Sequence, residues 1–139
     1  MRDNRQVGGR ENVELVRVTW DAIARGDLDT FARLLAPDAQ WRAVDDGEWN
    51  CDSREDVLAV MERNLAEGLG GRIEETFEFG ERVMVAFRPY EDTPLQRPLD
   101  NGIAYVVVTM RDGVIREVKG CVDRVAALTY ASVGELPDA

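Results

Sequence analysis

The order of two hydrophobic patterns constrains the fold most strongly, because helical patterns come first and strand patterns follow. Val13, Val16, Trp20 and Ile23 recur at three- and four-residue steps, so they share one face of a predicted helix. Residues 73–79 instead alternate between apolar and polar side chains, which is typical of a strand. Helices followed by a run of antiparallel strands predict an α+β domain, with the helices packed on one face of a bent sheet.

Turn and cap signals divide the chain into elements. Gly26 is expected to end the first helix, and either Asp27 or Asp29 can cap a short second one. Ser53 and a carboxylate three residues later have the spacing of a capping box before a third helix. The pair at 112–113, Asp-Gly, is a strong signal for a tight hairpin.

These signals predict one domain over residues 11–133, preceded by a disordered arm at 1–10 and followed by a tail at 134–139. Pro37 is expected to end the second helix. Strands are predicted over 39–44, 73–79, 82–90, 103–111 and 114–123, and a short closing helix over 124–131.

The charge of the chain excludes several partners. It has 27 acidic residues against 17 basic ones, for a formal net charge of −10, and nucleic-acid binding requires a basic patch. No stretch approaches the roughly 20 apolar residues of a membrane helix, so no membrane is expected as a partner. The polar N-terminal segment has no apolar core of a secretory signal, and we expect a cytoplasmic protein.

The chain contains no histidine. This absence removes Ser-His-Asp and Cys-His catalytic groups, and two cysteines alone cannot fill a zinc shell. We expect no cofactor and no metal, and any proton transfer must fall to Asp, Glu, Tyr, Lys or Cys. Asp45, Asp46 and Glu48 could bind a hard cation, but three acidic residues in one loop are more often solvated. In a reducing cytoplasm, Cys51 and Cys121 are predicted to be free thiols.

Three sequence segments carry a resemblance to a known family. Residues 24–29, ARGDLD, resemble the turn between the first two helices of the nuclear transport factor 2-like superfamily. Residues 35–41, LAPDAQW, resemble the segment entering its first strand. Residues 112–115, DGVI, followed by Asp123, resemble the last hairpin and closing strand of its SnoaL-like members.

The resemblance covers residues 12 to 132 and implies a cone-shaped domain, with N-terminal helices packed on a strongly bent mixed sheet. It also implies an apolar cavity and, in many members, a homodimer through the sheet. It does not imply one chemistry, since members include isomerases, cyclases, hydrolases and non-catalytic binding or association domains.

The family's catalytic positions match this chain only in part. The three residues that ketosteroid isomerases need fall on Thr19, Ala43 and about Val107, none of which can perform the proton transfer. SnoaL-type cyclases use a closing-strand aspartate as base, and Asp123 matches that position, but their partner histidine has no counterpart. Asp123 is therefore the candidate base, with helix capping before Arg124 as the alternative.

A candidate ligand pocket completes the predicted site. The residues expected to line it are Trp20, Trp41, Trp49, Tyr105 and Arg88. The alternative for the aromatic residues is a place in the core, and for Arg88 a cross-strand ion pair at the surface. Three functions stay open: a cofactor-free acid–base enzyme acting on a small apolar substrate, a non-catalytic binding protein for such a molecule, or a homodimeric association domain.

Overall fold

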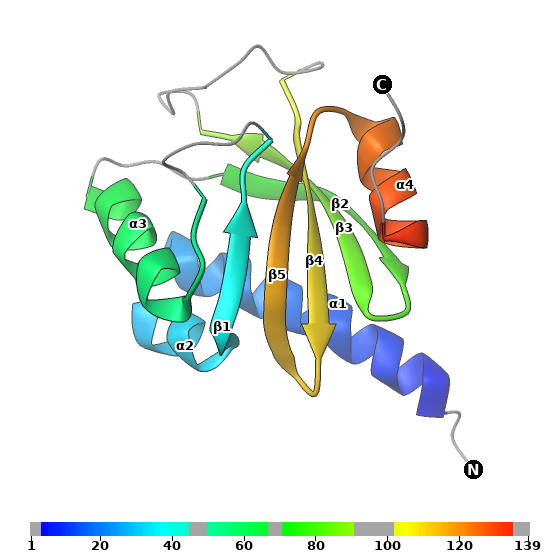
Figure 1. Cartoon of the computed structure of the whole chain (residues 1–139), viewed down its shortest axis with the longest axis horizontal. Coiled ribbons are helices and arrows are strands. Elements are labelled where there is room, and N and C mark those ends of the chain that lie inside the picture. Colours follow the sequence, from blue (N-terminus) through cyan, green and yellow to red (C-terminus); the bar gives the residue numbers. More distant parts are fainter. Residues whose placement is uncertain (1–3, 45–49, 67–70, 91–101, 135–139) are drawn as a thin grey trace.

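The computed structural model describes residues 4–44, 50–66, 71–90 and 102–134, and it confirms the predicted α+β fold. Three helices precede most of the sheet, four strands follow, and a fourth helix closes the chain (Figure 1). In chain order the elements are α1 (Asn4–Ala24), α2 (Leu28–Arg33), β1 (Leu35–Arg42), α3 (Arg54–Ala66), β2 (Gly71–Phe79), β3 (Arg82–Pro89), β4 (Ala104–Arg111), β5 (Val114–Cys121) and α4 (Arg124–Val133).

The sheet is mixed and open. Its five strands have the order β1-β5-β4-β3-β2, in which β1 runs parallel to β5 and the other neighbours are antiparallel. The register shifts where β1, β2 and β5 each carry extra residues relative to a neighbouring strand, and such bulges bend a strand and increase its twist. These register shifts explain locally why the mixed sheet is strongly bent, as predicted from the sequence.

Helices cover both faces of the sheet. α1, α2 and α3 pack on the inner face, where the main core includes Val16, Phe31, Val85 and Val108 (Figure 1). α4 packs on the opposite, outer face, where a second core joins Met84, Val107, Cys121 and small residues of the helix. The sequence predicted the closing helix, but the prediction that the helices share one face of the sheet is wrong for α4.

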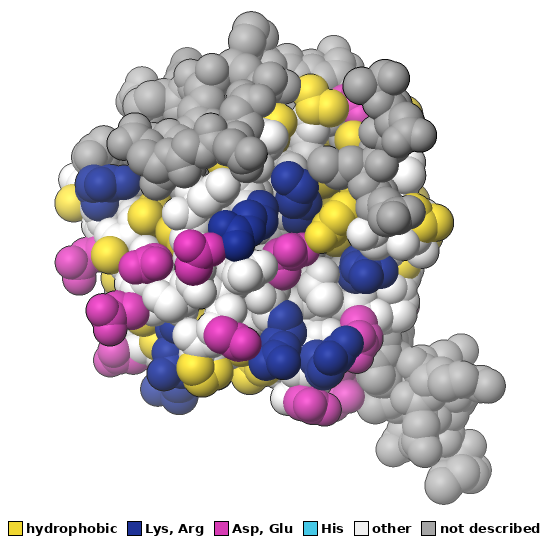
Figure 2. Space-filling model, viewed as in Figure 1, with side chains coloured by type: hydrophobic (Ala, Val, Ile, Leu, Met, Phe, Trp, Pro, Cys, Tyr) yellow, Lys and Arg dark blue, Asp and Glu magenta, His cyan; other side chains and the backbone are white. Residues whose placement is uncertain are grey.

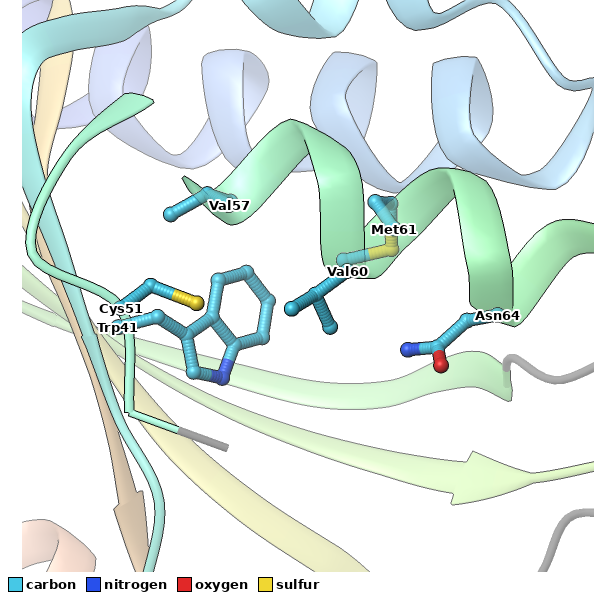
Figure 3. Close-up of a pocket in the computed structure, with 6 residues that line it drawn as sticks. All are labelled: Trp41, Cys51, Val57, Val60, Met61 and Asn64. Atoms are coloured by element: carbon cyan, nitrogen blue, oxygen red, sulfur yellow. The ribbon is translucent and has the colours of Figure 1, made fainter. Parts of the chain in front are cut away.

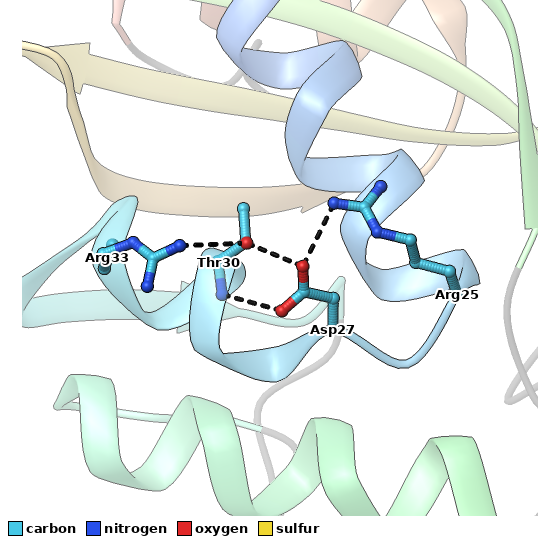
Figure 4. A network of polar contacts seen from close by, with 4 residues as sticks. All are labelled: Arg25, Asp27, Thr30 and Arg33. Carbon is cyan, nitrogen blue, oxygen red and sulfur yellow. Dashed lines mark hydrogen bonds and ion pairs between the residues drawn. The ribbon is translucent and has the colours of Figure 1, made fainter.

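Capping at α2 follows one of the two predicted alternatives. Asp27, and not Asp29, is the N-cap, and it accepts hydrogen bonds from the Thr30 backbone N–H at 3.1 Å and the Thr30 hydroxyl at 2.7 Å (Figure 4). Arg25 donates to the same carboxylate at 3.1 Å. These contacts, led by the Thr30 hydroxyl, lower the pKa of Asp27.

Three boundaries differ from the sequence prediction. α1 begins at Asn4 rather than near residue 12, so residues 4–10, predicted as an arm, are helical. α2 ends at Arg33 and not at Pro37, which lies inside β1. β1 is an edge strand in the described sheet, and proline is tolerated there because its missing N–H is not needed for a ladder.

Candidate functional site

A short backbone bridge brings two parts of the site together. Trp41 of β1 and Cys51 exchange antiparallel hydrogen bonds, with N···O distances of 3.0 and 2.8 Å. The Asn50 side chain adds a hydrogen bond from the Ala43 N–H at 2.9 Å. The chain that returns toward α3 is thereby held against β1, which places the Cys51 thiol beside the Trp41 indole (Figure 3).

The opposite wall of the site is one face of α3. Val57, Val60, Met61 and Asn64 follow a spacing of three, four and seven residues from Val57, so they share one side of the helix. The start of α3 is fixed by the Ser53 hydroxyl, which accepts from the backbone N–H three residues on at 3.2 Å, as predicted.

These two walls enclose a pocket of about 70 Å³. Its lining consists of Trp41, Cys51, Val57, Val60, Met61 and Asn64 (Figure 3). The floor is buried, since Val57, Cys51 and Met61 are 1, 3 and 8% exposed. Trp41, Val60 and Asn64 are half-buried and form a rim that solvent reaches.

The pocket lining is uncharged. Burial raises the pKa of the Cys51 thiol, and the nearby charges of Asp56 and Asp52 raise it further, so the thiol is neutral at pH 7. Two polar groups remain, the Trp41 indole N–H and the Asn64 amide. Within the described residues neither group forms a side-chain hydrogen bond. The pocket therefore combines apolar walls with hydrogen-bond donors that have no protein acceptor there.

The predicted pocket residues do not lie together. Trp41 lines the pocket, whereas Trp20 packs in the inner core with its ring centroid 5.8 Å from that of Phe87. Tyr105 packs on the outer face beneath α4. Arg88 is exposed and forms the cross-strand ion pair that was its alternative, with an Nε–Oε2 distance of 3.5 Å to Glu74. Trp49 lies outside the described residues.

Asp123 occupies the capping position that was its alternative. It is the N-cap of α4, and Oδ1 accepts a hydrogen bond from the Ala126 N–H at 2.8 Å. It does not line the pocket at Trp41. Lys119, on the last strand, donates to the Ala43 carbonyl at 3.4 Å instead of pairing with Asp123. A role of Asp123 as a base stays a prediction.

Two of the three isomerase positions, Thr19 and Val107, have structural roles here. Thr19 is buried, and its hydroxyl donates to the Leu15 carbonyl at 2.7 Å within α1. Val107 belongs to the outer-face core with α4, so its side chain is on the opposite side of the sheet from α1.

The sequence prediction of site residues missed five of the six residues that line the pocket: Cys51, Val57, Val60, Met61 and Asn64. A signal existed for Asn64, since it follows Val57 and Met61 on the same helical face and is the polar exception there. Cys51 and Trp41 meet through an isolated backbone bridge, for which the sequence between them gives no pattern.

Cys51 and Cys121 form no disulfide, as predicted; both are buried, and they belong to cores on opposite faces of the sheet. Within the described ranges no three residues among Cys, Asp and Glu cluster as a metal site would require. The acidic loop residues Asp45, Asp46 and Glu48 lie outside those ranges. None of the described helices is long and apolar enough to cross a membrane.

Fold and pocket together define a small α+β domain with helices on a bent open sheet. The chain belongs to the SnoaL-like domain family, whose family model matches residues 16–118, and this confirms the resemblance predicted from the sequence. No curated protein matches the sequence at a significant level.

Solved structures share the fold at low sequence identity. Bal32a, from a soil-derived mobile gene cassette, has a TM-score of 0.69 at 20% identity and covers 81% of this chain and 89% of its own. A candidate SnoaL-like polyketide cyclase from Jannaschia sp. CCS1 has a TM-score of 0.67 at 23% identity, covering 96% and 99%. A de novo designed protein with a curved β-sheet reaches 0.63 at 17% identity, covering 84% and 88%. These likenesses show the fold alone.

Proposed function

We propose that this protein binds a small, uncharged and largely apolar molecule in the pocket between α3 and β1. The observation that carries the proposal is the lining of that pocket, in which two donors without a described acceptor stand among apolar side chains. An apolar concavity with a few convergent polar groups is the usual form of a small-molecule site.

The volume of the pocket limits what enters it. At about 70 Å³ it is smaller than the roughly 150 Å³ of an engineered apolar cavity that binds benzene. We therefore expect a short aliphatic group on the floor, with the rest of a longer ligand passing the rim. Met61 is unbranched and has three rotatable bonds, so a change of its rotamer is the simplest way to enlarge the floor.

The polar groups select the functional group of the ligand. An indole N–H only donates a hydrogen bond, and the Asn64 amide also has donors. A carbonyl oxygen at the rim would accept from both Trp41 and Asn64. The ligand class that fits is a small ketone or ester, or a longer molecule that ends in such a group.

Binding, rather than turnover, is the function that the lining supports. The Jannaschia relative is named as a candidate polyketide cyclase, and polyketides are rich in carbonyl groups, which suits the two donors. A cyclase also needs a base within hydrogen-bond reach of its substrate. The six lining residues include no carboxylate, so turnover with Asp123 as base is the second candidate.

The test uses the indole N–H signal of Trp41 in proton–nitrogen NMR spectra. The chain has three tryptophans, and Trp41→Phe assigns the signal by its disappearance. Titration with 2-pentanone is expected to shift this signal and to raise the melting temperature by mass action. Pentane, which has no acceptor, is expected to shift it less. Asn64→Leu should reduce the preference for the ketone over the alkane.

A filled pocket provides the matched control. Val60→Phe places a ring at the rim and should abolish both shifts, whereas Val125→Phe, on a side chain 69% exposed, should leave them intact. The proposal fails if the ketone leaves the Trp41 signal unchanged, or if Val60→Phe binds it as wild type does.

A further inference from the structure

A second concavity lies on the outer face of the sheet, beside α4, and its character is opposite to that of the pocket. It is an open groove of about 360 Å³ lined almost entirely by polar side chains. On this side of the molecule basic and acidic side chains are interspersed (Figure 2). The groove shares no residue with the pocket between α3 and β1.

The floor of the groove is a row of side chains across four strands. Gln40 of β1 pairs with Glu117 of β5, which pairs with Thr109 of β4, which pairs with Arg82 of β3. Directly opposed residues on neighbouring strands project from the same face of a sheet. An amide, a carboxylate, a hydroxyl and a guanidinium therefore stand side by side, and all four side chains are half-buried.

Tyr130 of α4 holds the carboxylate of this row. Its hydroxyl donates a hydrogen bond to Oε1 of Glu117 at 2.5 Å, which fixes the carboxylate at one side of the phenol ring. The second oxygen, Oε2, has no hydrogen bond within the described residues. The groove thus presents an oriented carboxylate oxygen that is open to a donor.

Arg82 is the positively charged residue at the β3 end of this row. Its guanidinium carbon lies 6.0 Å from the centroid of the Tyr130 ring and packs against Gly134, where an added Cβ would come within 2.7 Å of Nη2. These contacts position the guanidinium, yet in the described part of the chain it forms no ion pair and no side-chain hydrogen bond. At the rim, Arg116 and Asp38 form an exposed ion pair of 3.6 Å with each other.

We propose that this groove binds an α-amino acid as its zwitterion, with the ligand carboxylate on Arg82 and the ligand ammonium on Glu117. A guanidinium binds a carboxylate through two parallel hydrogen bonds, and an ammonium group donates to a carboxylate oxygen. Tyr130 interacts with both groups, through its hydroxyl with Glu117 and through its ring with the Arg82 guanidinium. The net charge of −10 repels a free anion but exerts no such force on a neutral zwitterion.

Three small carboxylates separate the parts of this proposal: L-alanine, L-lactate and propionate. They share a carboxylate and carbon skeleton and carry ammonium, hydroxyl or hydrogen on the neighbouring carbon. Chemical-shift perturbation at the Thr109 and Glu117 amides is expected to rank their affinities in that order. Alanine should bind at least roughly tenfold more tightly than propionate, because its ammonium adds a charge-assisted hydrogen bond.

Variants assign each end of the ligand. Arg82→Gln should weaken alanine binding roughly tenfold or more, and Glu117→Gln should reduce the preference for alanine over lactate to within about twofold. Arg111→Gln, on an exposed arginine outside the groove, is the control for the loss of a charge. If Arg82→Gln unfolds, Arg82→Lys keeps the charge without the two-pronged geometry and should still weaken binding. Absence of any shift with alanine, or equal affinities of all three probes, would overturn the proposal.

Discussion

Oδ1 of Asp123 accepts a hydrogen bond of 2.8 Å from the backbone N–H of Ala126, which makes this aspartate the N-cap of α4. Asparagine caps a helix about as well as aspartate, whereas alanine does not. We therefore expect Asp123→Asn to leave the free energy of unfolding within a few tenths of a kcal/mol of wild type, and Asp123→Ala to lower it by about 1 kcal/mol. Urea unfolding followed by circular dichroism measures both.

The same pair of variants tests Asp123 as a base. An asparagine side chain cannot accept the proton, so turnover of any substrate should be lost in Asp123→Asn while the midpoint of unfolding stays unchanged. Retained turnover in that variant would exclude Asp123 as the base. Equal destabilisation by Asn and Ala would contradict the capping role.

Tyr130 is expected to titrate at unusually high pH. Burial, and after it the hydrogen bond to Glu117, raises the pKa of Tyr130 to about 12 from an ordinary value of about 10. Because the folded-state pKa is raised, the stability that the neutral phenol contributes is fully present below pH 10 and is lost as the pH rises through about 12.

The measurement is alkaline titration of tyrosinate absorbance at 295 nm for wild type and Tyr130→Phe. The difference between the two curves should rise near pH 12, and the wild-type advantage in stability should shrink between pH 10 and 12. A difference curve centred near pH 10 would show that Tyr130 is solvated and not bonded to Glu117.

Local signals in the sequence predicted much of the fold. Ser53 before α3 and Asp27 before α2 act through backbone groups within a few residues, so their chemistry is visible in the sequence. The Asp112-Gly113 turn works in the same way, since both residues adopt the positive φ that such a hairpin needs. Each of these predictions depends on contacts between near neighbours in the chain.

The candidate site depended on contacts that no local pattern specifies. Trp41 meets Cys51 only because the chain returns to pair with β1, and the face covered by α4 is decided by how Ala127 and Ala131 pack on Met84 and Val107. Aromatic character alone predicted a shared pocket for Trp20, Trp41 and Tyr105. The sheet in fact separates Tyr105 from Trp20 and Trp41, because alternate residues of a strand face opposite sides.

The two thiols are expected to react slowly in the folded protein. Burial raises the pKa of Cys121 to about 11 and also raises that of Cys51, so little thiolate is present at pH 8. A disulfide reagent such as DTNB should modify neither thiol readily in buffer and both rapidly in urea. Cys121→Ser isolates Cys51, whose slow reaction should be slowed further by a ligand bound in the pocket. Rapid reaction of Cys51 in the native state would contradict its place on the pocket floor.

Two glycines should resist substitution for different reasons. Gly113 has a φ of +81° and open space around it, so Gly113→Ala meets backbone strain alone and should lower the free energy of unfolding by about 1–2 kcal/mol. A Cβ at Gly71 would lie 2.7 Å from the Arg88 carbonyl oxygen, so Gly71→Ala meets a steric clash with backbone.

Asparagine distinguishes the two causes of instability because it tolerates positive φ but is larger than alanine. In urea unfolding, Gly113→Asn should be more stable than Gly113→Ala, and Gly71→Asn should be no better than Gly71→Ala. If Gly113→Asn were instead less stable than Gly113→Ala, the loss of stability at this position would come from packing and not from the backbone conformation of the turn.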